Sequence, residues 1–157
     1  MKIYQDSHVQ TFCFRDGKIQ NVNPDGPVVL IEVDEESLAH MDLSGIELIN
    51  ADLSELDLTG CILDFANLAG ANLVGANLTN ASLRNCWLMG AKFGRSTLSC
   101  VDISNSKLNS SLIEGVDLRG ARLDGAILGG AWIDSETLFP DTFDLTLHSL
   151  RRRRVID

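Results

Sequence analysis

The sequence predicts an all-β solenoid, and two repeating columns of residues carry that prediction. A large apolar residue occupies every fifth position from Leu43 to Ile133, nineteen times in succession. It is leucine except at Phe93, Ile103, Ile113 and Ile133. Two residues before each of them stands a small or apolar residue, most often alanine. So long a run without a slip indicates one repetitive architecture across this stretch.

A period of five fits neither a regular helix nor a continuous strand. On an α-helix each step of five advances by about 140°, which would spread the leucines around the surface. On a strand an odd step changes face, so alternate leucines would point into water. The chain must therefore turn once in every repeat. Glycine or asparagine often lies two residues after the leucine, as at Gly60 and Asn80, and both types tolerate tight corners.

Several repeats carry a specific motif, namely Ala51-Asp52-Leu53, Ala66-Asn67-Leu68, Ala71-Asn72-Leu73 and Ala76-Asn77-Leu78. They resemble the pentapeptide repeat family, whose motif is A-(D/N)-L-x-x. The resemblance covers residues 41–135 and implies a right-handed quadrilateral (four-sided) parallel β-helix with twenty residues per coil.

A coil of that length would make residues twenty apart direct neighbours. Asp64 would then lie beneath Arg84, Asp102 beneath Arg122, Leu112 beneath Trp132 and Trp87 beneath Lys107. Glu114 beneath Asp134 is a counterexample, because like charges would meet there.

The chain divides into an N-terminal β-rich cap over residues 1–36, the repeat β-helix over 37–138, and a C-terminal plug and basic tail over 139–157. Within the cap, 11–19 read as a hairpin and 28–33 as a strand. Solenoids need caps because their end coils expose apolar rungs and unpaired backbone groups. Recruitment of a partner by edge-strand pairing is the alternative for this segment.

At the other end, Leu138–Pro140 and Phe143 suggest the plug, and residues from 144 onward read as a tail. The tail includes the run Arg151–Arg154. Such a run is a solvated terminus or a contact for nucleic acid, acidic lipid or a partner's acidic face.

Charge is uneven along this acidic chain, whose formal net charge is −9. Between Ile19 and Leu83 there are eleven acidic residues and no lysine or arginine. The N-terminal start has no apolar signal core, and no apolar run approaches membrane length. We therefore expect a cytoplasmic protein that does not enter a membrane.

The sequence offers no catalytic, cofactor or metal set. His8, His40 and His148 are scattered, and the glycines follow the corner rule instead of forming a phosphate loop. Cys61 and Cys86 fall at inward positions, and no two cysteines have the CxxC spacing of zinc sites. These observations predict a protein that is not an enzyme, binds no cofactor and keeps reduced thiols.

An outward apolar strip is the candidate interaction surface, made of Trp87, Met89, Leu112, Ile127 and Trp132. Exposed aromatic clusters often mark interfaces, although a terminal segment folded over the strip would explain it equally well. The resulting hypothesis is a non-catalytic protein–protein interaction scaffold of unknown partner, with a homo-oligomer among the options.

The alternative surface is acidic, because Asp42, Glu47, Asp52 and Asp57 would ring the first coil. Some members of the family resemble duplex DNA and act on a type II topoisomerase, in gyrase protection or inhibition. That DNA-mimic reading ranks second here, because the acids form a ring at one end and basic residues occur throughout the second half. A solubilising ring is the simpler account. We expect no direct nucleic-acid binding, because the acidic body repels phosphate.

Overall fold

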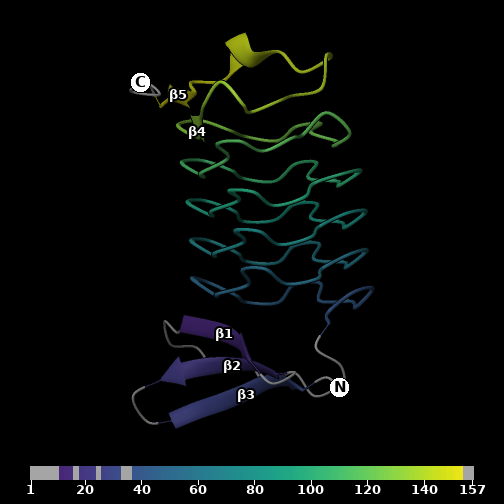
Figure 1. Ribbon diagram of the computed structural model, residues 1–157, viewed down its shortest axis with the longest axis vertical. Coiled ribbons are helices and arrows are strands. Elements are labelled where there is room, and N and C mark those ends of the chain that lie inside the picture. The colour runs from purple at the N-terminus through teal and green to yellow at the C-terminus, as the bar shows by residue number, and fades with distance from the viewer. Residues whose placement is uncertain (1–10, 16–17, 24–25, 33–36, 154–157) are drawn as a thin grey trace.

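The repeats wind into a column of stacked coils in the computed structural model (Figure 1). The structure describes residues 11–15, 18–23, 26–32 and 37–153. Parallel β-bridges join residues twenty apart, beginning with Asp42 and Ile62. A turn recurs every five residues, so each coil contains four turns. The predicted twenty-residue spacing of neighbours is confirmed.

Backbone hydrogen bonds hold each coil to the next. Leu68 N donates to Trp87 O of the following coil at 2.8 Å, and Asn67 N donates to Ile46 O of the preceding coil at 2.9 Å. The same pattern recurs along the column. Neighbouring coils therefore satisfy the backbone groups that a short isolated segment would leave unpaired.

Each turn depends on one residue in the left-handed backbone region. Every fifth residue from His40 to Gly130, except Gly120, has φ between 55° and 73°. Glycine and asparagine occupy most of these corners, as predicted, because they adopt this conformation at least cost. Phe65 and Arg95 are among the exceptions.

The interior is a ladder of large and small apolar side chains. All nineteen central residues from Leu43 to Ile133 are buried. Alanine is the commonest residue of the second inward column, while Met41 and Leu56 are partly buried against the core. Each buried large side chain contributes roughly 1.5–3 kcal/mol of transfer free energy, so this ladder dominates the stability of the column.

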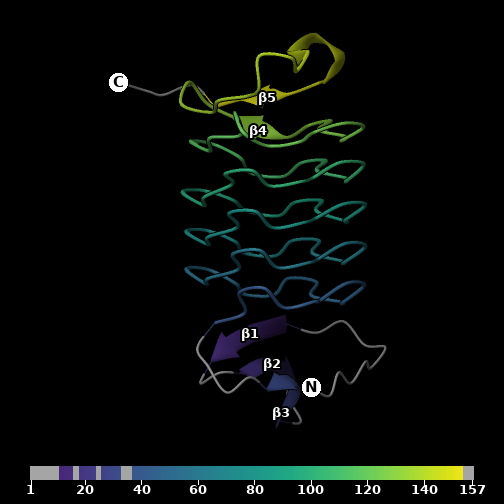
Figure 2. The ribbon, with the colours of Figure 1, turned by 90° about the vertical axis from the view of Figure 1, so that its right-hand side faces the viewer.

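The N-terminal segment forms an antiparallel sheet of three strands, β1 (Thr11–Arg15), β2 (Lys18–Asn23) and β3 (Gly26–Glu32). The predicted hairpin and strand are confirmed, while residues 16 and 17, between the two strands of the hairpin, lie outside the described residues. Both views place this sheet beyond the first coil, at the N-terminal end of the column (Figures 1 and 2).

At the opposite end the repeat closes irregularly. Asp117 bridges Leu138, one residue beyond the coil period. The rings of Phe139 and Phe143 then stack with their centres 5.1 Å apart, and both side chains pack against the core. These aromatic rings occupy the place predicted for a plug.

The prediction of a tail from residue 144 needs correction up to Arg153. A short 3-10 helix, η1 (Leu145–Leu147), leads to strand β5 (Arg151–Arg152), which pairs in parallel with β4 (Trp132–Ile133). Sequence reasoning missed this return because it lies outside the repeat. The first arginines of the run are therefore part of the last coil.

Replacing Leu78 by aspartate tests the closed interior. Leu78 is fully buried, so Leu78→Asp places an unpaired charge in a dry core and is expected to cost more than about 4 kcal/mol. Circular dichroism during thermal unfolding measures the effect. Asn80→Asp, two residues later and exposed, has Gly60 and Cys100 at the same corner of the adjacent coils; it is the matched control and should leave the transition almost unchanged. A cooperative wild-type transition in Leu78→Asp would refute the closed column.

Candidate interaction surface

One wall of the column presents the most exposed part of the apolar strip. Bridges stack Asn67, Trp87, Lys107 and Ile127 in successive coils. Trp87 and Ile127 are each 48% exposed. The ammonium nitrogen of Lys107 lies 4.4 Å from the centre of the Trp87 ring, in cation–π contact. The predicted neighbours Trp87 and Lys107 therefore do lie together.

The rest of the strip is less accessible. Leu112 and Trp132 stack on the next wall and are half-buried, as is Met89. The guanidinium of Arg151 lies 5.4 Å from the centre of the Trp132 ring, which brings β5 over that side chain. A terminal segment therefore covers part of the strip, while Trp87 and Ile127 stay open to solvent.

The acidic ring has a structural role that sequence reasoning missed. Asp42 Oδ1 accepts hydrogen bonds from the backbone N (3.0 Å) and hydroxyl (2.6 Å) of Ser44, two residues later. Asp52 and Asp57 accept equivalent bonds. The spacing Asp-x-Ser/Thr is the sequence signal for this turn-stabilising bond. Glu47 makes no such local bond among the described contacts.

These bonds also favour the ionised form of the three aspartates. Hydrogen bonds from the Ser44, Ser54 and Thr59 hydroxyls, the largest influence, lower the pKa of Asp42, Asp52 and Asp57. Asparagines of the second coil add further donors. Asn67 Nδ2 donates to Glu47 Oε2 at 2.8 Å, and Asn72 Nδ2 donates to Asp52 Oδ1 at 3.0 Å.

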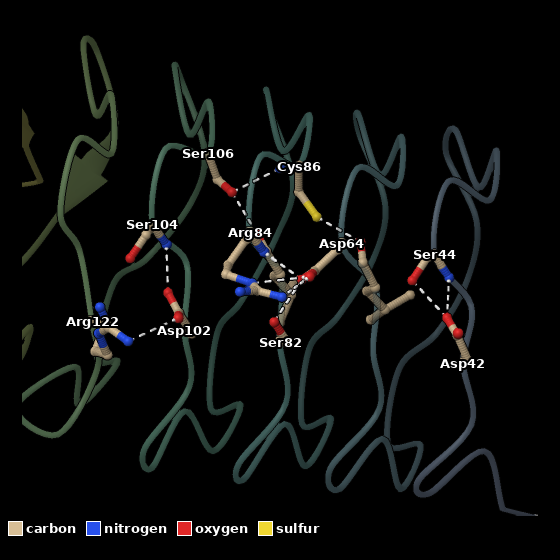
Figure 3. Close-up of polar contacts among 12 residues, drawn as sticks. Asp42, Ser44, Asp64, Ser82, Arg84, Cys86, Asp102, Ser104, Ser106 and Arg122 are labelled. Atoms are coloured by element: carbon tan, nitrogen blue, oxygen red, sulfur yellow. Dashed lines mark hydrogen bonds and ion pairs between the residues drawn. The ribbon is translucent and has the colours of Figure 1, made fainter.

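A second polar ladder runs along the wall that begins with Asp42 (Figure 3). The Asp64 carboxylate is buried and accepts hydrogen bonds from Ser82 Oγ at 2.6 Å, Arg84 N at 3.0 Å and Arg84 Nε at 2.9 Å. Arg84 Nη2 completes a two-pronged ion pair. Two coils later, Arg122 Nη1 lies 3.4 Å from Asp102 Oδ2. Both predicted opposite-charge neighbours are confirmed.

The Asp64 carboxylate stays charged despite its burial. Burial alone would raise its pKa, but the hydrogen bonds from Arg84 and Ser82 outweigh burial, so the pKa lies below its ordinary value.

The predicted clash of Glu114 with Asp134 is also resolved. Arg153 Nη1 lies 3.4 Å from Glu114 Oε1, while Asp134 Oδ1 accepts a hydrogen bond from Gly115 N at 2.9 Å. Each carboxylate therefore has its own partner.

Phe65 is a surface residue that the sequence reasoning did not single out. It occupies a corner with φ of 63° and is 66% exposed. Bulky residues adopt this backbone region rarely, because it brings Cβ close to the following carbonyl. The signal in the sequence was an aromatic residue at a Gly/Asn position.

Metal-binding and nucleophilic groups do not converge in the described part of the chain. No group of three histidine, cysteine or acidic side chains there could hold a metal ion. His40 is at an exposed corner, whereas His148 stacks on Phe143 with ring centres 4.7 Å apart. Cys61 and Cys86 are free and buried, as expected, and their thiols donate to Leu38 O and Leu63 O.

The family model for pentapeptide repeats, in eight copies, matches residues 37–64, 63–95, 76–115 and 96–132. The chain belongs to the pentapeptide repeat family. This membership identifies the column as a β-helix. Within the described residues, no helix is long and apolar enough to cross a membrane.

Solved pentapeptide repeat proteins resemble this one in structure. The protein alr5209 from Nostoc Pcc 7120 is 31% identical over 68% of this chain and 84% of its own, with a TM-score of 0.55. HetL, involved in heterocyst differentiation regulation in Nostoc sp. strain PCC 7120, is 30% identical over 68% of this chain, with a TM-score of 0.53. This chain covers 52% of HetL, about half of its length. No curated protein matches the chain.

Acidification tests the Asp64–Arg84 pair. Because the pKa of Asp64 is lower in the folded chain than in the unfolded one, its stabilisation is complete above about pH 4 and is lost as pH falls through the folded pKa. Asp64→Asn should lower the unfolding free energy at pH 7 by about 1–3 kcal/mol, and this deficit should shrink toward pH 2.

Urea unfolding at several pH values measures both quantities. Asp124→Asn removes an exposed carboxylate 3.6 Å from Arg122 and serves as the control, with an expected change below about 0.5 kcal/mol. A deficit for Asp64→Asn that is independent of pH would exclude the ionised pair as its cause.

Thiol labelling tests the burial of the inward cysteines. Burial raises the pKa of Cys61 to about 11 and of Cys86 to about 12, so neither supplies a reactive thiolate at neutral pH. In a Cys13→Ser background, maleimide should label the exposed Cys100 alone until denaturant is added. Further replacement by Cys100→Ser should abolish native labelling. Rapid modification of Cys61 or Cys86 would mean an open column.

Proposed function

We propose that this pentapeptide repeat protein is a non-catalytic protein–protein interaction scaffold of the cytoplasm. The observation that carries the proposal is the wall on which Trp87 and Ile127 are nearly half exposed. A tryptophan held by a rigid column gives up little conformational freedom when a partner covers it. Large aromatic anchors of this kind supply much of the affinity at protein interfaces.

The right-handed, four-sided form of the coil is part of the proposal. The twenty-residue period and the four turns per coil support four sides, and right-handedness follows the family. Such a column offers flat outer walls, because inward side chains alternate with outward ones along each short side.

Residues 1–36 and 139–157 are proposed as caps of this column. The antiparallel sheet beyond the first coil supports the first cap (Figure 2), and the packing of Phe139 and Phe143 against the core supports the second. Capped ends leave the side walls as the natural surfaces for partners.

The absence of catalysis is proposed from the chemistry of the surface. Its ionised carboxylates have structural partners, such as Ser44 for Asp42 and Arg84 for Asp64. The described histidines, His40 and His148, lie at a corner of the first repeats and on Phe143 near the C-terminal end. This arrangement supports a binding surface better than a general acid–base pair.

The DNA-mimic alternative is the second candidate, favoured by the ionised ring of Asp42, Asp52 and Asp57. A mimic of duplex DNA would present negative charge along the column. Cations of the later coils, including Lys92, Lys107 and Arg122, interrupt such a stripe. The scaffold is therefore preferred.

An affinity pull-down from native cytoplasm, at low and high salt, separates the two functions. The first variant combines Trp87→Ala with Trp132→Ala, and Trp87→Ala alone isolates the exposed residue. Loss of a central aromatic anchor is expected to cost about 2 kcal/mol, roughly thirtyfold in affinity, with weak salt dependence.

The second variant combines Asp42→Asn, Glu47→Gln, Asp52→Asn and Asp57→Asn. It removes four charges but keeps the oxygen acceptors, as Asn77 already accepts from Thr79 N and Oγ. Folding should therefore survive. A partner lost with the tryptophans and retained with the amides supports the scaffold. A topoisomerase lost only with the amides, and released by salt, would establish the mimic instead.

A further inference from the structure

Phe65 is the exception among the residues that stack at its corner of the column. The other members of its stack, one coil apart, are Gly45, Asn85, Asn105 and Gly125, all glycine or asparagine. The phenyl ring gains little burial in return for the unfavourable backbone, because it is 66% exposed. Backbone strain that folding does not repay points to a function at that residue.

Other exposed apolar side chains gather around this corner. Trp87 stacks on Asn67, two residues after Phe65, and is 48% exposed. Ile62, three residues before Phe65, is 40% exposed. Among residues 37–153, the other exposed large apolar side chains are Ile127, on the same wall as Trp87, and Leu138, Leu145 and Leu147 near the C-terminal end. Phe65 therefore extends the exposed apolar surface of the Trp87 wall around the adjacent corner.

Lys107 supplies the charge of this surface. Its ammonium lies against the Trp87 ring, 4.4 Å from the centre, and takes part in none of the ion pairs found among the described residues. Arg84, by contrast, is committed to Asp64. Lys107 is thus the cation that a partner's carboxylate can meet here.

The wall around Lys107 contains no carboxylate over three coils. Residues 85–90, 105–110 and 125–130 lack aspartate and glutamate, although the chain has 22 acidic residues. Glu47 bounds the wall two coils below Trp87 and is bonded to Asn67. A negatively charged partner would be repelled by the acidic first coils but not by this wall.

The geometry points to a peptide-binding site at Phe65, Trp87 and Lys107 for an extended acidic segment of a partner protein. An apolar side chain of the segment packs against Phe65 and Trp87, and a carboxylate binds Lys107. This inference rests on the proposed scaffold function and names the chemistry of its partner. An extended segment suits the site because Phe65, Trp87 and Lys107 lie in three successive coils, so their side chains follow one another along the column.

The dimensions agree with a short segment. Phe65 and Ile127 are three coil steps apart, roughly 14 Å at about 4.8 Å per step. About eight extended residues, roughly 26 Å long, cover that distance with both flanks.

Selection from a displayed library of random peptides of about eight residues tests the inference on the full chain. Counter-selection against Trp87→Ser removes peptides that bind elsewhere. We expect enrichment of sequences that combine aspartate or glutamate with aromatic or aliphatic residues. Enrichment of basic sequences, or of none, would overturn the inference.

The affinities of an enriched peptide for variants of the protein then show which residues form the binding site. Lys107→Gln should weaken binding about tenfold and Lys107→Glu more, with the loss growing at low salt. Lys92→Gln, an exposed lysine of the next wall, is the matched control and should bind like wild type. Equal losses for Lys92→Gln and Lys107→Gln would reduce the effect to net charge and refute the site.

Phe65→Gly gives a readout that a structural role would not produce. Glycine relieves the left-handed corner, so the denaturation midpoint should rise while peptide affinity falls about tenfold. A lower midpoint together with unchanged affinity would make Phe65 a structural residue. Dimerisation that depends on Phe65, seen by sedimentation, would assign the surface to a second copy and overturn the peptide site.

The outcomes separate this inference from the scaffold itself. If pull-down of a partner depends on Trp87 while no acidic peptide is selected, the scaffold stands and the acidic partner is wrong. If Trp87 is dispensable in both experiments, both proposals fail.

Discussion

The hydrogen bonds between successive coils are the constraint on which this structure depends. They form because a residue with positive φ turns the chain every five residues. Four such turns bring the chain back above its starting point after twenty residues. With the backbone satisfied in this way, each short side needs two inward residues to close the core. The outward residues do not fill the core, so their type can vary, as the acidic Asp42 and the aromatic Trp87 illustrate.

The same spacing extends from the backbone to the polar side chains. Asp64 meets Arg84, and Glu47 meets Asn67, because each pair is separated by one coil. A surface carboxylate can therefore be structural without any partner nearby in the sequence. This overlap of roles explains why acidic residues on the wall are weak evidence for a binding site unless their local bonds are known.

The sequence was sufficient where the repeat is regular. The leucine column predicted the core, and the twenty-residue coil implied by the family predicted the neighbours of Asp64 and Trp87. It was insufficient where contacts are not periodic. The return of Arg151 over Trp132 depends on an irregular segment, and the exposure of Phe65 depends on backbone geometry that a pattern of residue types does not measure.

The four-turn coil also limits how such a chain can change in length. Insertion of five residues between Trp87 and Lys107 would preserve every inward leucine but move all later residues one wall onward. The cation and the indole would then face different directions, although the core would be intact. Only a change of twenty residues returns each later side chain to its original wall. Length variation in this protein is therefore quantised: one repeat redirects the surface, and one full coil lengthens it.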